Sequence, residues 1–199
     1  MNVLELFAGS RSFSKVAEEM GHNTFTTDSE PFQKIDYVTD ILDFDYKKVP
    51  FKPEIIWASP PCTSFSVASI GSSWIGDYCP KRVETALGMA YVLKTIEIIK
   101  RFKPEFWFIE NPRGVLRKMA FMEDLERKTV TYCQYGDHRM KPTDIWTNLK
   151  WTPRQMCKNG DPCHISAPRG SKTGTQGLKD SYDRSIVPPE LCREIIENI

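Results

Sequence analysis

The sequence predicts an α/β fold in which helices pack against a mixed, mostly parallel β-sheet. In the first half of the chain, short apolar segments bounded by turn residues alternate with segments whose apolar residues recur at helical spacing. That alternation is typical of βαβ units. The chain has 199 residues, of which 40% are hydrophobic, so it can bury the core of one domain.

The individual elements follow from these local patterns. Segments that are short, apolar and bounded by turn residues are expected to be strands, and they are 3–7, 24–27, 37–41, 54–58 and 106–109. Segments with helical spacing or helix-start signals are expected to be helices, and they are 11–20, 81–101, a short stretch near 114–126, and 187–196. Two further segments, 129–134 and 143–147, are expected to form a closing antiparallel pair.

Charge and composition divide the chain. The formal net charge is only +1, which gives no whole-chain signal for a nucleic-acid partner. From Lys150 to Arg184, however, seven lysines and arginines face three acids, and Gly, Pro, Ser and Thr are frequent. We therefore expect a main domain at 1–149 and 184–199 and a small basic loop segment at 150–183. Loops of this length are usually functional or disordered.

The sequence also indicates a compartment. No apolar run approaches the roughly 20 residues of a membrane span, and no basic segment precedes a long apolar one. Six cysteines are scattered along a chain that can build its own core, so mostly free thiols are expected. These features predict a cytoplasmic protein with no membrane contact.

Cys62 is the first candidate for chemistry. It follows Pro60 and Pro61 directly after the expected strand at 54–58. Two prolines fix φ and remove two backbone donors, so the chain must leave the sheet there and hold the next side chain in a defined direction. A nucleophile needs such a mounting, although a buried, inert cysteine is the simpler alternative.

Glu110 ends the strand that should lie beside the strand before Cys62. The carboxyl ends of neighbouring parallel strands open into the same crevice, so both side chains should face it. A thiol beside a carboxylic acid is a pair suited to covalent catalysis with acid–base help. A purely structural carboxylate is the alternative. Arg139, followed by Lys141, comes after another strand and is a candidate to stabilise negative charge, or else lies in a solvated turn.

Other candidates lie where the first strands end. The turn Phe7-Ala8-Gly9-Ser10 joins a strand to a helix start, where small residues let backbone amides approach a ligand. Asp28 ends the second strand, in the position of acids that bind a ribose. Asp40, followed by Ile41, is placed to accept a bond from an adenine amino group. An ordinary tight turn and solvated surface acids are the alternatives.

A third group of residues raises the question of a metal. Cys157, Cys163 and His164 lie close together in the basic segment. The simpler interpretation is a polar loop with free thiols and no metal, because the five-residue gap exceeds the usual zinc-knuckle spacing. A zinc site is the alternative, with Cys133 or Asp161 as its fourth ligand. The stretch 169–177 is expected to be a mobile linker or a basic groove contact.

Taken in order, these segments resemble the DNA (cytosine-5) methyltransferase family. Phe7-Ala8-Gly9 is similar to its first cofactor motif, Ser59-Pro60-Pro61-Cys62 to its catalytic Pro-Cys motif, and Glu110-Asn111-Pro112 to its Glu-Asn motif. Gln134 and Arg139 are similar to its Gln-x-Arg-x-Arg motif at wider spacing, and 187–191 to the start of its last motif. The resemblance covers roughly 1–148 and 184–199, with the segment at 150–183 much shorter than the usual target-recognition region.

The resemblance implies a Rossmann-like class I S-adenosylmethionine-dependent methyltransferase fold with a seven-stranded sheet. It also implies that S-adenosylmethionine is the methyl donor, and that Cys62 attacks carbon 6 of a flipped cytosine in DNA while Glu110 and Arg139 assist. The residues that it implies for cofactor binding are Phe7, Ala8, Gly9, Ser10, Asp28, Asp40, Ile41, Ser59 and Pro60.

The same resemblance leaves other functions open. It is closest to short, phage-type members associated with restriction–modification, which predicts a short or relaxed target site. We expect a monomer, with a protein partner for target recognition as an alternative. Competing functions are an amino-methyltransferase on DNA bases, a non-catalytic DNA-binding module of the same fold, and a methylase of free nucleotides.

Overall fold

A single seven-stranded sheet forms the centre of the computed structural model, which describes residues 1–166, 178 and 180–199. The strand order is β3-β2-β1-β4-β7-β9-β8. The bounds are Asn2–Leu6 for β1, Asn23–Asp28 for β2, Tyr37–Val38 for β3, Ile55–Ala58 for β4, Phe106–Pro112 for β7, Arg127–Thr131 for β8 and Pro142–Thr147 for β9. The pairs among β1, β2, β3, β4 and β7 are parallel, and β9 is antiparallel to both β7 and β8. The predicted mixed, mostly parallel sheet is therefore confirmed.

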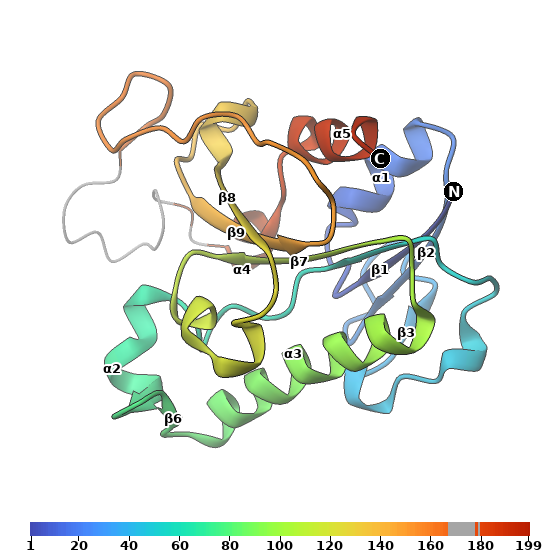
Figure 1. The fold of residues 1–199 in the computed structure, drawn as a ribbon, viewed down its shortest axis with the longest axis horizontal. Coiled ribbons are helices and arrows are strands. Elements are labelled where there is room, and N and C mark those ends of the chain that lie inside the picture. The colour runs from blue at the N-terminus through green and yellow to red at the C-terminus, as the bar shows by residue number, and fades with distance from the viewer. Residues whose placement is uncertain (167–177, 179) are drawn as a thin grey trace.

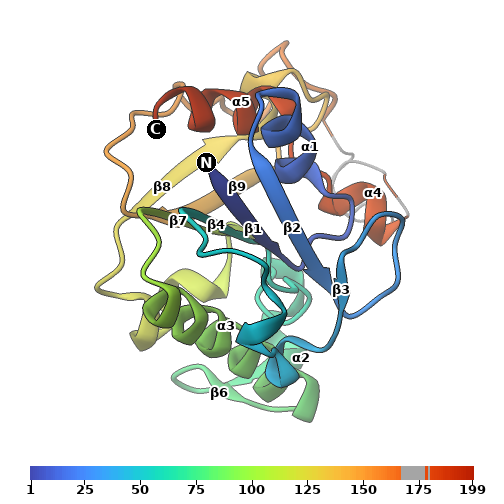
Figure 2. The same cartoon turned by 90° about the vertical axis from the view of Figure 1, so that its right-hand side faces the viewer.

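Helices cover both faces of this sheet (Figures 1 and 2). Helices α1 and α5 lie side by side on one face, and the long helix α3 crosses the other. The bounds are Ser12–Glu19 for α1, Ile70–Ser73 for α2, Val83–Phe102 for α3, Ser181–Ser185 for α4 and Pro189–Glu197 for α5. A two-stranded hairpin, β5 at Trp74–Ile75 and β6 at Cys79–Pro80, precedes α3.

Each face of the sheet has its own hydrophobic core. On the side of α1 and α5, Phe13 stacks on Trp57 with ring centroids 4.6 Å apart, and Leu191 of α5 is fully buried in the same cluster. On the side of α3, Val92 and Ile98 pack in one cluster with Ile56 of the sheet. Sheet residues are therefore apolar on both faces, as expected for strands covered by helices.

A buried carboxylate fixes the start of α1. Glu5 of β1 is 2% exposed and accepts the backbone N–H groups of Phe13 at 3.3 Å and Ser14 at 2.8 Å. These are amides of the first helical turn, which have no partner within the helix. Burial raises the pKa of Glu5, and the bonds from Ser14 oppose that shift. The turn from β1 into α1 is thus held rigidly beside the candidate cofactor residues.

Several expected elements are shorter or different. The strand at 37–41 stops at Val38, because the Asp40 side chain accepts Leu42 N–H and starts a 3₁₀ turn, η1 at Ile41–Asp43. The helix near 114–126 is two 3₁₀ turns, η4 at Val115–Lys118 and η5 at Ala120–Met122. The strand at 129–134 begins at Arg127 and ends at Thr131, where η6 at Tyr132–Tyr135 follows.

The fold also contains short 3₁₀ turns between its strands and helices. Two more 3₁₀ turns are η2 at Tyr46–Lys48 and η3 at Val67–Ser69. Within the described residues, no helix is both long and apolar enough to cross a bilayer. Part of the basic segment at 150–183, including the expected linker at 169–177, lies outside the described residues.

Candidate active site

Cys62 lies in a loop that β7 and the turn after it hold in place. The loop leaves β4, whose residues pair with β7 in parallel. The side-chain amide of Asn111 donates to the Pro60 carbonyl at 2.9 Å, and both residues are buried. Further along the loop, Val115 N–H donates to the Phe65 carbonyl at 2.7 Å. The candidate nucleophile is therefore fixed from both sides to the strand that carries Glu110.

Gly114 allows this close approach. A Cβ atom at position 114 would lie 2.1 Å from the Phe65 carbonyl oxygen, a separation that real Cβ atoms do not reach. The backbone of the turn after β7 therefore packs directly against the backbone of the Cys62 loop, which only glycine permits. Sequence reasoning did not identify this residue as part of the site.

Glu110 is held by an aromatic hydroxyl. It is 4% exposed, and the Tyr132 hydroxyl donates to its Oε1 at 2.9 Å. Tyr132 is fully buried, and the Lys141 ammonium lies 4.6 Å from the centre of its ring. The structure thus places an acid and a cation on either side of one tyrosine ring. Tyr132 is a second residue that sequence reasoning did not single out.

Electrostatic coupling joins Cys62 to this pair. Burial raises the pKa of the Cys62 thiol, the charge of Lys141 lowers it, and the charge of Glu110 raises it. Burial lowers the pKa of Lys141, while Glu110 and then Cys62 raise it. The three groups therefore lie within electrostatic range of one another at the carboxyl edge of the sheet, where the sequence predicts that Cys62 and Glu110 meet. Lys141 is 8% exposed, and its ammonium donates to the Arg184 carbonyl at 2.9 Å.

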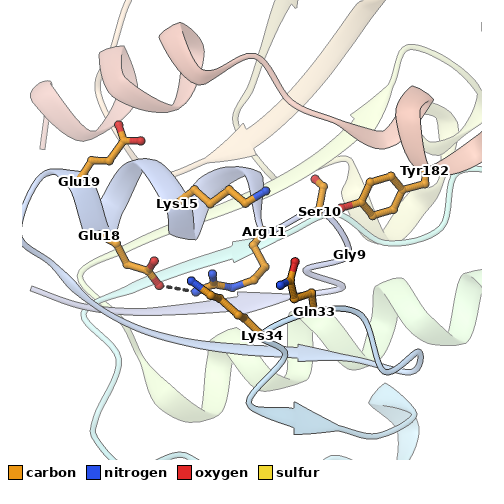
Figure 3. Close-up of a pocket in the computed structure, with 9 residues that line it drawn as sticks. All are labelled: Gly9, Ser10, Arg11, Lys15, Glu18, Glu19, Gln33, Lys34 and Tyr182. Atoms are coloured by element: carbon orange, nitrogen blue, oxygen red, sulfur yellow. Dashed lines mark hydrogen bonds and ion pairs between the residues drawn. The ribbon is translucent and has the colours of Figure 1, made fainter.

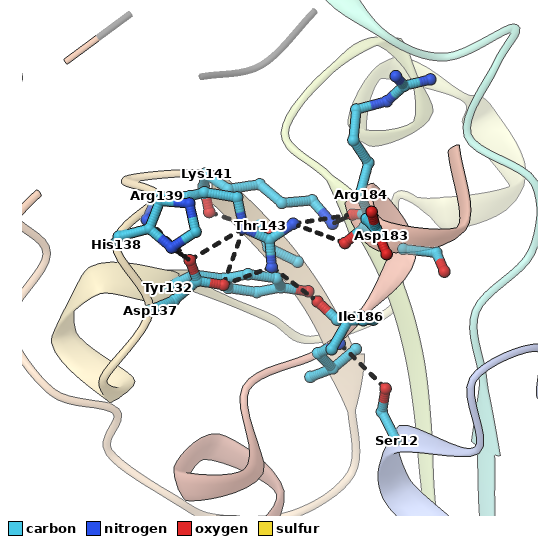
Figure 4. Close-up of polar contacts among 12 residues, drawn as sticks. Ser12, Tyr132, Asp137, His138, Arg139, Lys141, Thr143, Asp183, Arg184 and Ile186 are labelled. Atoms are coloured by element: carbon cyan, nitrogen blue, oxygen red, sulfur yellow. Dashed lines mark hydrogen bonds and ion pairs between the residues drawn. The ribbon is translucent and has the colours of Figure 1, made fainter. Parts of the chain in front are cut away.

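Arg139 has a different set of partners from the one expected (Figure 4). Its guanidinium forms an ion pair with Asp137, and it donates to the carbonyls of Asp183 at 3.1 Å and Ile186 at 3.1 Å. It is only 3% exposed. Arg139 therefore joins the β8–β9 connection to the segment that contains α4. The charge of Lys141, and to a smaller extent that of Arg184, lowers the pKa of Cys62.

A second group of predicted residues forms a separate pocket. The pocket is small, about 40 Å³. It lies between the ends of β2 and β3, the loop that carries Cys62, and Tyr91 in the middle of α3. Its lining contains four of the predicted cofactor residues together with five others. They are Phe7, Asp28, Asp40 and Ile41, with Thr27, Ser29, Thr39, Pro61 and Tyr91.

Two carboxylates and two aromatic rings define this pocket. Asp28 accepts Gly9 N–H at 2.9 Å, which pins the turn after β1 to the end of β2. Asp40 accepts the Tyr91 hydroxyl at 3.2 Å, and the rings of Phe7 and Tyr91 lie 6.1 Å apart. Sequence reasoning missed Tyr91, because a tyrosine on the apolar face of a long helix is ordinarily a core residue.

Other predicted cofactor residues lie elsewhere. Gly9 and Ser10 line a larger, open hollow of about 400 Å³ on the other side of the turn, together with Lys15 and Tyr182 (Figure 3). Its basic residues include Arg11, which is paired with Glu18.

The last three predicted cofactor residues belong to the two turns that supply Phe7 and Pro61 to the small pocket. Ala8 is buried, Ser59 accepts the Trp57 indole N–H at 3.0 Å, and the Pro60 carbonyl accepts Asn111. These contacts hold the turns that surround the small pocket.

Comparison with known proteins assigns the chain to a family. The family described as C-5 cytosine-specific DNA methylase matches residues 1–131, which is more than half of the chain. The chain belongs to this family. It is also 28% identical over 217 residues to the "Probable DNA (cytosine-5)-methyltransferase" of Frog virus 3 (isolate Goorha), with 99% of both sequences covered.

A solved structure supports the fold of this family member. A protein assigned as a DNA modification methyltransferase, encoded within an E. coli prophage, is similar with a TM-score of 0.55 and 14% identity. The match covers 74% of this methylase and 46% of the prophage protein. This methylase therefore spans about half the length of that protein. At this identity the likeness concerns the methyltransferase fold alone.

Proposed function

We propose that this methylase transfers a methyl group from S-adenosylmethionine to carbon 5 of cytosine in DNA, through a covalent adduct between Cys62 and the base. Membership of the cytosine-specific family supports the reaction class. The single observation that carries the assignment of residues is the hydrogen bond from Asn111, next to Glu110 in β7, to the Pro60 carbonyl, which holds the Cys62 loop beside Glu110. The charge of Lys141, which lowers the pKa of the Cys62 thiol, agrees with this assignment.

Cys62 is the nucleophile in this proposal. Its thiolate adds to carbon 6 of the cytosine ring, which makes carbon 5 electron-rich enough to accept a methyl group. After the methyl group has been transferred, loss of the carbon 5 proton restores the double bond and releases the Cys62 thiolate. Burial disfavours the thiolate, and the neighbouring Lys141 favours it. The cation therefore offsets part of the cost of forming a thiolate at this half-buried position.

Glu110 stabilises the addition. A carboxylic acid that is hydrogen-bonded to ring N3 and to the amino group would stabilise the negative charge that develops on the ring when the sulfur adds. The Tyr132 hydroxyl donates to one oxygen of Glu110 at 2.9 Å, which leaves the other oxygen for the base. Tyr132 is thus a positioning residue in the proposal.

In this proposal Lys141, and not Arg139, is the positive charge that acts on Cys62. The family resemblance implies that Arg139 is the cation that assists the reaction. The contacts of its guanidinium with Asp137 and with the carbonyls of 183–186 support a positioning role, in which Arg139 holds the segment whose Arg184 carbonyl binds Lys141. We propose Lys141 as the charge that faces the reacting thiol.

The lining of the small pocket suits part of the methyl donor, since a space of about 40 Å³ is too small for the whole molecule. Two carboxylates suit the hydroxyls of a ribose and a positive sulfonium, and the Phe7 and Tyr91 rings with Ile41 suit an adenine face. S-adenosylmethionine would supply an electrophilic methyl group there. Phe7, Asp28, Asp40 and Ile41 would hold it, and Gly9, Ser10, Ala8, Ser59 and Pro60 would shape the surrounding turns.

DNA contact and target choice follow from the short basic segment. Lys150, Arg154 and Lys158 lie in its described part, where phosphate contacts would give affinity without sequence information. Lys150 would exchange its ion pair with Glu126 for a phosphate, and Arg154 its ion pairs with Glu190 and Glu194. We therefore propose a short target site. The monomeric state, a partner for target recognition, a cytoplasmic location and the domain division at 150–183 remain predictions.

The test is to identify the modified nucleoside. DNA treated with purified protein and labelled S-adenosylmethionine is digested and analysed by mass spectrometry, for wild type, Cys62→Ala and the control Cys79→Ala, which changes an exposed cysteine. We expect 5-methylcytosine from wild type and the control only. N4-methylcytosine or N6-methyladenine would support the amino-methyltransferase, product on free nucleotides alone would support the nucleotide methylase, and binding without any product would support the non-catalytic module.

A further inference from the structure

A cluster of three cysteines and one histidine lies outside the proposed active site. The potential ligand atoms of Cys133, Cys157, Cys163 and His164 all lie within 4.8 Å of one another. Cys133 belongs to η6 after β8, whereas the other three lie in the loop after β9. The fold therefore brings together two segments that are 24 residues apart at their closest, as shown by the pair Cys133 and Cys157.

Three separations among these atoms match the edges of a tetrahedral metal site. Zinc–sulfur and zinc–nitrogen bonds of about 2.3 and 2.0–2.1 Å imply S···S edges of about 3.8 Å and S···N edges of about 3.6 Å. Cys163 Sγ lies 3.7 Å from Cys133 Sγ, and His164 Nδ1 lies 3.7 Å from Cys157 Sγ and 3.6 Å from Cys163 Sγ. The Cys133–Cys157 edge is shorter, 2.9 Å, so binding of an ion would move these two sulfurs apart.

We propose that these four residues bind one structural Zn²⁺ ion. Three thiolates and one imidazole are a common structural zinc set, and four protein ligands leave no open position for catalysis. Binding would release three thiol protons and leave a site of net charge −1. Cys133 thus supplies the fourth ligand that the sequence left open, while Asp161 instead accepts Lys158 N–H at 2.7 Å within its own turn.

Neighbouring groups suit the bound state. The Gln134 side-chain amide lies 3.6 Å from Cys163 Sγ, positioned to donate to a thiolate. Ser166 Oγ lies 3.5 Å from His164 Nε2, positioned to accept its proton when Nδ1 binds the metal. The Cys157 N–H donates to Thr131 Oγ1 at 3.1 Å, which fixes the loop to the end of β8.

The site would fasten the basic loop to the catalytic edge. Ile165, next to His164, donates its N–H to the His138 carbonyl at 2.9 Å. His138 precedes Arg139, the clamp on the segment at 183–186. The ion would therefore hold the described part of the basic segment against the β8–β9 connection, remote from the small cofactor pocket.

The test is metal content together with a spectrum. The full chain is purified under reducing conditions from zinc-supplemented cells, and zinc per chain is measured for wild type, Cys157→Ser, Cys163→Ser and the control Cys79→Ser. We expect one zinc in wild type and the control, and loss in the other two. Because a cysteine variant can fail to fold, Co²⁺ is also exchanged into wild type, where a thiolate-to-cobalt charge-transfer band and intense tetrahedral d–d bands are expected.

A milder change tests Ser166, which contacts the proposed ligand His164 and not the ion. Ser166→Ala should weaken zinc binding roughly tenfold in a chelator competition while the protein stays folded. Wild-type protein without stoichiometric zinc and without the cobalt bands would overturn the proposal. So would a Cys133–Cys157 disulfide found by mass spectrometry in the reduced preparation, or equal zinc loss in Cys79→Ser.

Discussion

The side-chain amide of Asn111 donates a 2.9 Å hydrogen bond to the carbonyl of Pro60, so the residue after the proposed acid holds the loop of the proposed nucleophile. Both residues are buried; Asn111 belongs to β7, and Pro60 lies in the loop directly after the neighbouring strand β4. Because this bond joins β7 to the loop after β4, it helps to fix how far Cys62 lies from Glu110. The bond between Asn111 and Pro60 therefore connects the segments that carry the proposed catalytic residues Glu110 and Cys62.

Removal of this bond should weaken both stability and activity. Asn111→Ala leaves the buried Pro60 carbonyl without its partner, which costs about 1–3 kcal/mol of unfolding free energy. Urea unfolding measures that loss, and steady-state methylation should show a reduced kcat. Asn198→Ala, at an exposed asparagine of the last helix turn, is the matched control. Unchanged stability in Asn111→Ala would mean that the loop is held by other contacts.

Gly114→Ala should disturb the same loop through a steric clash. Its new methyl group would lie 2.1 Å from the Phe65 carbonyl oxygen, so the backbones must separate. We expect a loss of about 1–3 kcal/mol in unfolding free energy, typical of overpacking. The control is Gly71→Ala in α2, where an added Cβ meets no atom within 4 Å. Equal unfolding midpoints for the two variants would contradict the close approach.

Lys141→Met should shift the ionisation of Cys62. Lys141 lowers the pKa of the thiol, so loss of its charge raises that pKa and moves thiolate formation to higher pH. The measurement is the rate of Cys62 alkylation by iodoacetamide against pH, resolved by peptide mass spectrometry. Lys141→Arg should stay near the wild-type curve, as should Lys150→Met at an exposed lysine paired with Glu126. A shift to lower pH in Lys141→Met would refute the assignment.

Asp28→Asn and Asp40→Asn should weaken binding of S-adenosylmethionine. Each keeps the shape of the side chain but removes a charge from the small pocket. Loss of a charge-assisted bond is worth about 1.5–3 kcal/mol, or roughly 10- to 100-fold in Kd. Calorimetric titration measures the effect, with Asp43→Asn at an exposed position of η1 as control. Wild-type affinity in both variants would place the donor elsewhere.

Strands and their neighbours are predictable here because the local patterns are strong. Ile55–Ala58 is apolar, Phe106–Pro112 begins with four apolar residues, and a proline lies two residues before each strand. Parallel strands that follow each other through a helix also tend to be adjacent. The proximity of Cys62 and Glu110 follows from that topology. The sequence is therefore sufficient to predict that both residues lie at the same edge of the sheet.

Side-chain contacts between distant segments were not predictable in the same way. Arg139 and Lys141 are two residues apart on a connection without a regular period, so the sequence does not indicate which cation faces Cys62. Gly114 carries no local signal for its contact with Phe65, and Cys133 lies 24 residues before Cys157. Each depends on how loops pack, which neither propensity nor periodicity encodes.

The measurement that tests the central claim most directly is mechanism-based trapping. Wild type, Cys62→Ala and the control Cys79→Ala are incubated with S-adenosylmethionine and DNA that contains 5-fluorocytosine, then separated on a denaturing gel. Fluorine at carbon 5 cannot leave as a proton does, so the covalent adduct should persist in wild type and in Cys79→Ala and be absent from Cys62→Ala. A trapped adduct in Cys62→Ala, or 5-methylcytosine formed on ordinary DNA without any adduct in wild type, would contradict Cys62 as the nucleophile.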